Sequence, residues 1–235
     1  MPLLADHLLI VLLVVLAPFS AVQWRRQMER EIAAGGAEAR IRCYRVGASW
    51  QWMNAAIPLV LWAAAQRDWS ELGLGLSRSW GFAAACALAV AVVALLSSQA
   101  TAARKDASVA AKVTAGAAAV EYLLPASERE FRAFWAVGLT AGIVEELLYR
   151  GYLIWYLDTY LPLWAAAVGA GIVFGVGHAY QGTAGVRNTA VIGVVMAGVY
   201  LLAGSLWPAM FIHAAWDMLQ VRMFLNARMA LAAQI

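Results

Sequence analysis

The stretch Thr140-Ala-Gly-Ile-Val-Glu-Glu-Leu-Leu-Tyr-Arg150 is the most informative part of this chain. It places two adjacent carboxylates and an arginine inside the run 131–157, which is otherwise apolar and aromatic apart from Arg132. An ionisable side chain in a lipid-embedded helix is costly, so it normally pairs, faces the interior of a helix bundle, or takes part in chemistry. These charges therefore predict a structural or functional cluster within a membrane helix.

Helical geometry separates the three charges of this stretch. Glu146 and Arg150 are four residues apart and share a helix face, so they are predicted to form an ion pair. Glu145 is rotated by about 100° from Glu146 and points elsewhere, without that partner. We therefore expect one carboxylate to be structural and the other to be available for chemistry.

The composition indicates an integral membrane protein. The 235 residues are 63% hydrophobic and only 13% charged, with a mean hydropathy of +0.69. A soluble domain is nearer to half apolar and a quarter charged. The apolar runs are continuous over helix-spanning lengths and do not alternate at period two, which argues against an outer-membrane barrel. The expected fold is all-α, a polytopic bundle of seven or eight transmembrane helices in a single domain, 1–235, with its motif-bearing core at 130–226.

Seven expected spans follow the apolar runs, at roughly 4–23, 50–66, 80–103, 130–156, 162–181, 188–204 and 206–226. The first is expected to be retained, because no basic segment precedes it and no A-x-A site follows it. A polar segment with six arginines, 25–49, separates it from the second span. The stretch 104–124 is expected to lie along the membrane as an amphipathic segment rather than to form an eighth span. Glycines expected to mark close helix packing in the fifth and sixth spans are Gly169, Gly171, Gly175, Gly177, Gly193 and Gly198.

The distribution of Lys and Arg predicts the orientation. Seven spans leave only Arg67 and Arg78 on one side, whereas the other side collects the segments 25–49 and 104–129 together with Arg187 and Arg228. Because the positive side of a membrane protein is normally cytoplasmic, the N terminus is expected outside and the C terminus in the cytoplasm.

Two of the three histidines fall in apolar helices. His7 lies near the start of the first span, where an interfacial role is expected. The other two belong to Phe174-Gly-Val-Gly-His178 and His213-Ala-Ala-Trp-Asp217, whose end residues share a helix face at i,i+4. A carboxylate near an imidazole can activate water as a general base, and a second imidazole can stabilise an oxyanion. These residue types suit hydrolysis without a covalent nucleophile.

The motifs E-E-x-x-x-R, F-x-x-x-H and H-x-x-x-N/D, in this order on successive membrane helices, resemble those of the CAAX protease and bacteriocin-processing family. Its members are intramembrane glutamic endopeptidases related to the type II CAAX prenyl protease. In this chain the motifs span residues 145–217, about a third of the sequence. Each motif alone is weak, whereas the ordered set is specific; the N-terminal half contributes only its hydrophobicity.

The resemblance implies a role for each matching residue. Glu145 with His178 would activate the attacking water, and His213 with residue 217 would hold the oxyanion. The catalytic set is thus Glu145, His178, His213 and Asp217, and the supporting set is Glu146, Arg150 and Phe174. Residue 217 is Asp here, where the CAAX-processing branch typically has Asn. Because an ionised Asp cannot donate a hydrogen bond to an oxyanion, we expect Asp217 to orient His213 instead.

The expected span boundaries leave a conflict between the two histidines. His178 falls near the cytoplasmic end of its helix, whereas His213 falls nearer the outer end of its own. At about 1.5 Å per residue, the two would differ in depth by more than one site allows. Either the helix ends are misplaced by several residues, or a helix is tilted or broken around Gly175 and Gly177.

The expected function is a metal-independent, cofactor-free endopeptidase in the plasma membrane of a prokaryote, acting on a membrane-associated protein or peptide. Its partners would be this substrate and the lipid bilayer, and no nucleic acid. A proton-coupled transporter is an alternative, since buried Glu and His form proton relays, although no inverted repeat is visible. A non-catalytic scaffold or immunity protein is another. A zinc site from Glu, His and Asp is disfavoured by the absence of H-E-x-x-H, and the G-x-S-G and G-x-G-D motifs of serine and aspartyl intramembrane proteases are also absent.

Overall fold

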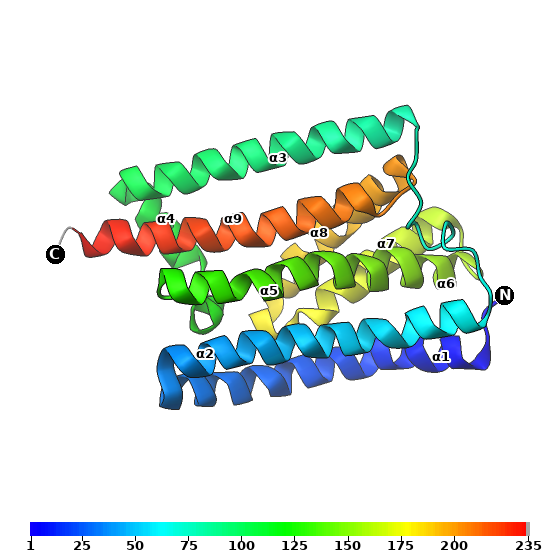
Figure 1. Ribbon diagram of the computed structural model, residues 1–235, viewed down its shortest axis with the longest axis horizontal. Helices are drawn as coiled ribbons and strands as arrows, with labels where there is room; N and C mark the ends of the chain where they lie inside the picture. The colour runs from blue at the N-terminus through cyan, green and yellow to red at the C-terminus, as the bar shows by residue number, and fades with distance from the viewer. Residues whose placement is uncertain (234–235) are drawn as a thin grey trace.

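The computed structural model describes residues 1–233, which form a bundle of long helices (Figure 1). Helix accounts for 86% of the chain, and no strand occurs in residues 1–233, which confirms the all-α expectation. The elements are α1 (Leu4–Val11), η1 (Leu12–Leu16), α2 (Ala17–Ala64), α3 (Trp80–Lys105), α4 (Ala107–Gly116), η2 (Ala118–Leu123), α5 (Glu128–Glu145), η3 (Glu146–Leu153), α6 (Ile154–Asp158), α7 (Leu163–Gly177), η4 (Ala179–Gln181), α8 (Gly182–Ala203) and α9 (Trp207–Ala232).

The first 64 residues form a helical hairpin. α1, the π-helical segment η1 and the first part of α2 run in one direction, and the chain reverses at Gly36 (Figure 1). Gly36 has φ +56°, a left-handed conformation that glycine adopts without a steric penalty. The segment 25–49, expected only as a polar stretch between two spans, is therefore helical on both sides of the turn. Each arm is about 40–50 Å long, which exceeds the ~30 Å of a bilayer core.

The described chain has the helices of a membrane protein. Three helical segments, Leu4–Ala64, Trp80–Lys105 and Ala179–Ala203, are long and apolar enough to cross a bilayer, and α7 is a shorter apolar helix. The full count of seven spans stays a prediction. α4 has only ten residues, about 15 Å, and is too short to cross the ~30 Å core as a helix.

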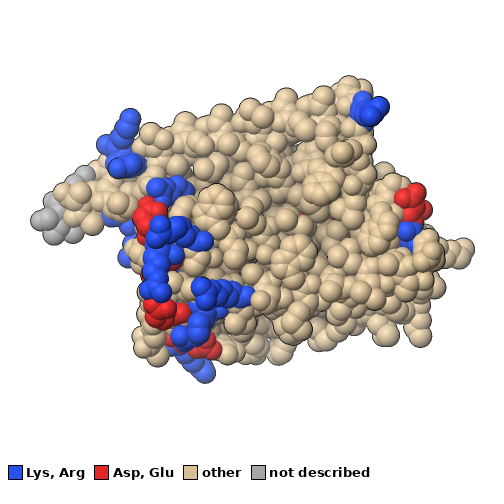
Figure 2. All heavy atoms as spheres, viewed as in Figure 1, with Lys and Arg blue, Asp and Glu red and all other residues tan. Residues whose placement is uncertain are grey.

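Basic side chains gather at one end of the bundle. Figure 2 shows most Lys and Arg at the end where the hairpin turns and α9 ends, with few at the opposite end. Two arginines of the hairpin contact the rest of the fold there. Arg40 pairs with Glu130 at 2.6 Å, and Arg25 pairs with Glu29 at 2.8 Å and donates to the carbonyl of Tyr180.

A buried ion pair fixes the opposite end. Asp6 is fully buried and accepts two hydrogen bonds from Arg67, at 2.9 and 2.5 Å, and one from the hydroxyl of Tyr152 at 2.5 Å. The next residue, His7, has its Nδ1 2.6 Å from the hydroxyl of Tyr156. These contacts connect the start of the chain to η3 and α6, so the N-terminal hairpin and the motif-bearing half hold each other in place.

Glycines allow close helix packing on both sides of the motifs. Gly142 of α5 faces α9, and a Cβ built on it would lie 2.6 Å from the Cβ of Ala214. Gly171 and Gly193 lie backbone to backbone between α7 and α8, where Gly175 also allows close approach, as expected. The same expectation is wrong for Gly198, because no described atom lies within 4 Å of a Cβ placed there.

Candidate active site

The first motif lies where the helix type changes. Glu145 is the last residue of α5, and Glu146 begins the π-helical segment η3. π-helical turns widen the helix by one residue per hydrogen-bonded ring and often occur at functional sites. The expected ion pair is present within this wider turn, since the Nη1 of Arg150 lies 2.8 Å from the Oε1 of Glu146.

The structure brings the two histidines to one depth, although the expected spans placed them apart. α7 ends at Gly177 after 15 residues, about 22 Å, and does not reach residue 181 as expected. His178 follows α7 directly, and its Nε2 lies 3.9 Å from the same Oε2 atom of Glu145 as the Nε2 of His213.

Glu145 lies between the two imidazoles. Its Oε2 is 3.9 Å from the Nε2 of His178 and 3.9 Å from the Nε2 of His213. Its side chain is 18% exposed, whereas that of Glu146 is fully buried. The two neighbouring carboxylates thus differ as the helical geometry predicts: Glu146 is enclosed by partners, and Glu145 faces the space between the histidines.

Hydrogen bonds fix the tautomer of each imidazole. The Nδ1 of His178 is 2.8 Å from the carbonyl oxygen of Phe174, which can only accept, so Nδ1 carries a proton. The Nδ1 of His213 is 2.7 Å from the Oε1 of Glu146 and donates to that carboxylate. In both histidines the remaining nitrogen, Nε2, is therefore directed toward Glu145.

Glu146 and Arg150 form a buried unit beneath the site. Their side chains are 0% and 1% exposed. Arg150 also donates to the carbonyl of Gly193 at 3.2 Å, and its guanidinium lies 4.2 Å from the ring centre of Phe174. The Oε1 of Glu146 accepts from both Arg150 and His213, while its Oε2 has no partner in the described residues. Phe174 thus packs against the cluster on the side of α7.

Asp217 does not occupy the orienting position that the sequence suggests. Its Oδ2 is 3.8 Å from the Nε2 of His213, which is too long for a hydrogen bond. Glu146 makes the orienting bond instead, on the opposite nitrogen. Asp217 and Glu145 therefore approach the same Nε2 atom of His213.

Gln51 is a site residue that the sequence analysis missed. It comes from the second arm of α2, and its Nε2 donates to the Oε1 of Glu145 at 3.4 Å. Its own Oε1 is buried and has no hydrogen-bond partner among residues 1–233. An amide within the apolar second span was the available signal, but the hydrophobicity of that span does not show which other helix it packs against.

No group of three or more His, Cys, Asp or Glu side chains in the described part of the chain has the spacing of a metal site. The arrangement places the carboxylate of Glu145 between the Nε2 atoms of His178 and His213. His213 is itself held by Glu146 of the buried ion pair.

Residues 128–219 match the family model described as type II CAAX prenyl endopeptidase Rce1-like. The matched segment contains all three motifs and extends from the start of α5 into α9. No curated protein and no solved structure matches the chain. The resemblance inferred from the motifs is therefore confirmed for this segment.

Proposed function

We propose that this chain, with its Rce1-like segment, is an intramembrane endopeptidase that hydrolyses a peptide bond in a membrane-associated protein or peptide. The observation that supports this most strongly is the position of Glu145, whose Oε2 is 3.9 Å from both Nε2 atoms. A water molecule about 2.8 Å from both Glu145 and His178 would make an angle of about 90° between them, which is compatible with two hydrogen bonds. The proposed reaction needs no metal ion.

In the first step, Glu145 and His178 remove a proton from this water while its oxygen bonds to the scissile carbonyl carbon. The negative charge passes to the carbonyl oxygen. His213, as an imidazolium held through Nδ1–H by Glu146, donates from Nε2 to this oxyanion. In the second step the C–N bond breaks, and the proton taken from water passes to the leaving nitrogen. The products are a carboxylic acid and an amine, which then exchange a proton to become a carboxylate and an ammonium group.

Asp217 has a different role in this proposal from that of an asparagine. As a carboxylate it does not donate to the oxyanion, but it balances the charge of the His213 imidazolium from 3.8 Å away. Glu146 and Arg150 act as positioning residues, because they touch His213 and Phe174 and not the substrate.

The proposed orientation follows from the charges. The basic end, which includes the hairpin turn and the C terminus, would face the cytoplasm, and the N terminus would lie outside (Figure 2). The site would then be reached within the membrane from between the helices or from the basic end. A prokaryotic plasma membrane stays the expectation from the sequence.

The test compares peptide termini in membranes from cells that carry the wild type, Glu145→Gln or His178→Ala. Termini seen only with the wild type would identify the substrate and the cleaved bond. Glu121→Gln is a matched control, because Glu121 is exposed and lies outside the motifs. Wild-type termini that persist with either site variant would contradict the mechanism.

Two further outcomes separate the alternatives. Identical termini in all strains, with folded and equally abundant proteins, would favour a transporter or a scaffold. Chelators should leave cleavage unchanged, and inhibition that zinc reverses would favour a metalloprotease.

A further inference from the structure

A second feature of the basic end lies apart from the candidate active site. A hollow of about 470 Å³ lies between α3 and α9. Its α3 wall includes Ser97, Thr101, Arg104 and Lys105, whose spacing places them on one helix face. Its α9 wall includes Arg222, which lies nine residues from His213, about 13 Å along the helix.

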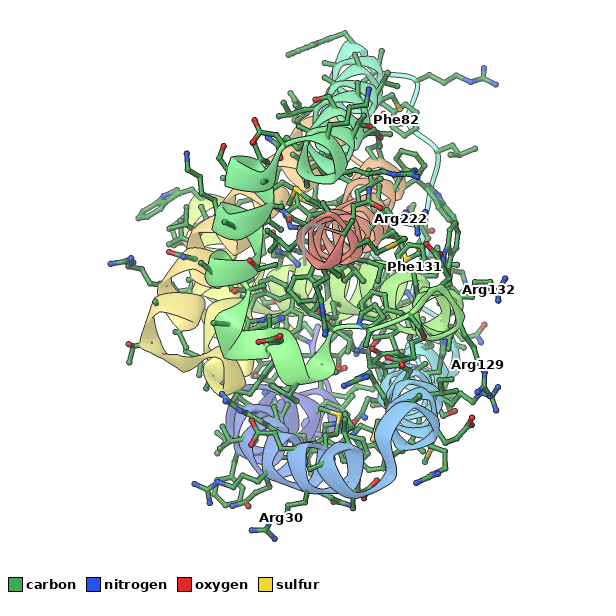
Figure 3. All side chains as sticks on the ribbon, turned by 90° about the vertical axis from the view of Figure 1, so that its left-hand side faces the viewer. Arg30, Phe82, Arg129, Phe131, Arg132 and Arg222 are labelled. Atoms are coloured by element: carbon green, nitrogen blue, oxygen red, sulfur yellow. The ribbon has the colours of Figure 1, made fainter. Side chains whose placement is uncertain are left out.

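The hollow contains more positive than negative charge. Arg222 pairs with Glu128 and lies 5.1 Å from the ring centre of Phe131. Figure 3 labels Arg222 and Phe131 at this end of the bundle. Arg104 and Lys105 have no carboxylate within ion-pair distance in the part of the chain that the structure describes. Two of the three cations, Arg104 and Lys105, therefore lack a counter-charge among the described residues and can bind an anion.

The position of the hollow along α3 matches the level of lipid phosphates. From Trp80 to Ala103, α3 contains no charged residue, and Arg104 and Lys105 follow directly. The change from an apolar run to adjacent cations places the border of the hydrocarbon core at this point. The α9 residue Asn226 donates to the carbonyl of Ala100 at 2.8 Å and fixes the spacing of the two helices there.

We propose that this hollow binds the phosphate headgroup of an anionic phospholipid. Arg104 and Lys105 supply the charge, Ser97 and Thr101 line the site with hydroxyl groups, and the acyl chains extend along the exposed apolar surface of α3. Basic pockets between membrane helices on the cytoplasmic side bind such headgroups.

A general excess of cations at the cytoplasmic end does not account for this arrangement, because cations from two helices converge on one hollow. A second hollow, of about 410 Å³ at the opposite end, gives a contrast. Its described lining includes Glu71 and Asp158 and neither Lys nor Arg, so it offers nothing to an anion.

The test measures lipid binding to the purified full-length protein in detergent by native mass spectrometry. The probes are short-chain phosphatidylglycerol and phosphatidylcholine. The wild type should prefer phosphatidylglycerol. Arg104→Gln/Lys105→Gln should weaken its binding roughly 10- to 30-fold. Arg26→Gln/Arg30→Gln removes the same charge from exposed positions of α2 at the same end and should change binding less than about twofold.

A second variant keeps both cations and fills the hollow. Thr101→Trp should reduce phosphatidylglycerol binding while leaving the charge unchanged. Equal losses in both double variants, or no preference over phosphatidylcholine, would overturn the proposal. If millimolar inorganic phosphate displaces the lipid completely, the site is one for free phosphate and the lipid assignment is wrong. None of these outcomes depends on proteolysis, so the proposal stands or falls separately from the proposed function.

Discussion

At the scale of single residues, Glu146 has two functions in one carboxylate. Its Oε1 accepts from Arg150, which stabilises the fold, and from His213, which sets the orientation of a site residue. The sequence predicted the first contact from i,i+4 spacing, because both residues lie on one helix. The second contact joins α9 to η3, and no local spacing rule predicts contacts between helices.

Arg150→Ala should mainly reduce stability. It would leave Glu146 buried without its cation, and breaking a buried ion pair typically costs about 3–5 kcal/mol. Thermal unfolding in detergent should show a clearly lower midpoint and a lower yield. Arg129→Ala, which removes an exposed ion pair with Glu38, should change stability by less than about 1 kcal/mol. Similar midpoints for the two variants would argue against a structural role for Arg150.

Gln51→Ala should lower kcat about 10-fold and leave KM nearly unchanged, because Gln51 positions Glu145 through a hydrogen bond to a charged group. Asn54→Ala is the control: Asn54 lies one turn along the same arm, and its amide donates to the carbonyl of Trp50. Both would be assayed on the substrate found from the peptide termini. A change in KM alone would assign Gln51 to substrate binding instead.

At the scale of elements, the sequence predicted helices well and helix shape poorly. Apolar runs gave the approximate positions of most of the long helices. The π-helical turn of η3 and the early end of α7 were not predictable, because a hydrophobic run has the same composition in either helix type. Both features lie at the motifs: η3 begins at Glu146, directly after Glu145, and α7 ends directly before His178.

Gly142→Val should separate α5 from α9 and reduce both activity and stability. Its Cβ would lie 2.6–2.7 Å from side-chain and backbone atoms of Ala214, next to His213, and backbone cannot move aside cheaply. Gly198→Val is the matched control, since no described atom lies within 4 Å of its Cβ. Cleavage by the first variant at the wild-type rate would show that this packing does not hold the site together.

At the scale of the whole molecule, hydropathy predicted the class of the protein but not the long N-terminal hairpin. The segment 25–49 is polar because both arms extend past the apolar part of the bundle, and polarity alone also suits a loop. The motifs in the second half of the chain predicted the residues of the candidate site, apart from Gln51. The contact of Gln51 with Glu145 could not be predicted, because the sequence does not show that the hairpin packs against α5.

The orientation can be checked by cysteine labelling in intact cells after replacement of Cys43 and Cys86 by serine. A membrane-impermeant reagent should label Arg78→Cys directly, whereas Arg30→Cys should react only after permeabilisation. Reaction of both positions in permeabilised cells shows that each is accessible. Direct labelling of Arg30→Cys alone would reverse the proposed topology.

The double use of Glu146 also has an evolutionary consequence. Under the proposed function, a descendant that no longer cleaved its substrate could lose Glu145 or His178 without damage to its folding, because neither side chain takes part in the buried ion pair. It could not easily lose Glu146 or Arg150, which support the bundle whether or not anything is cleaved. On this proposal, non-catalytic descendants would lose the carboxylate of Glu145 first and keep the buried pair of Glu146 and Arg150.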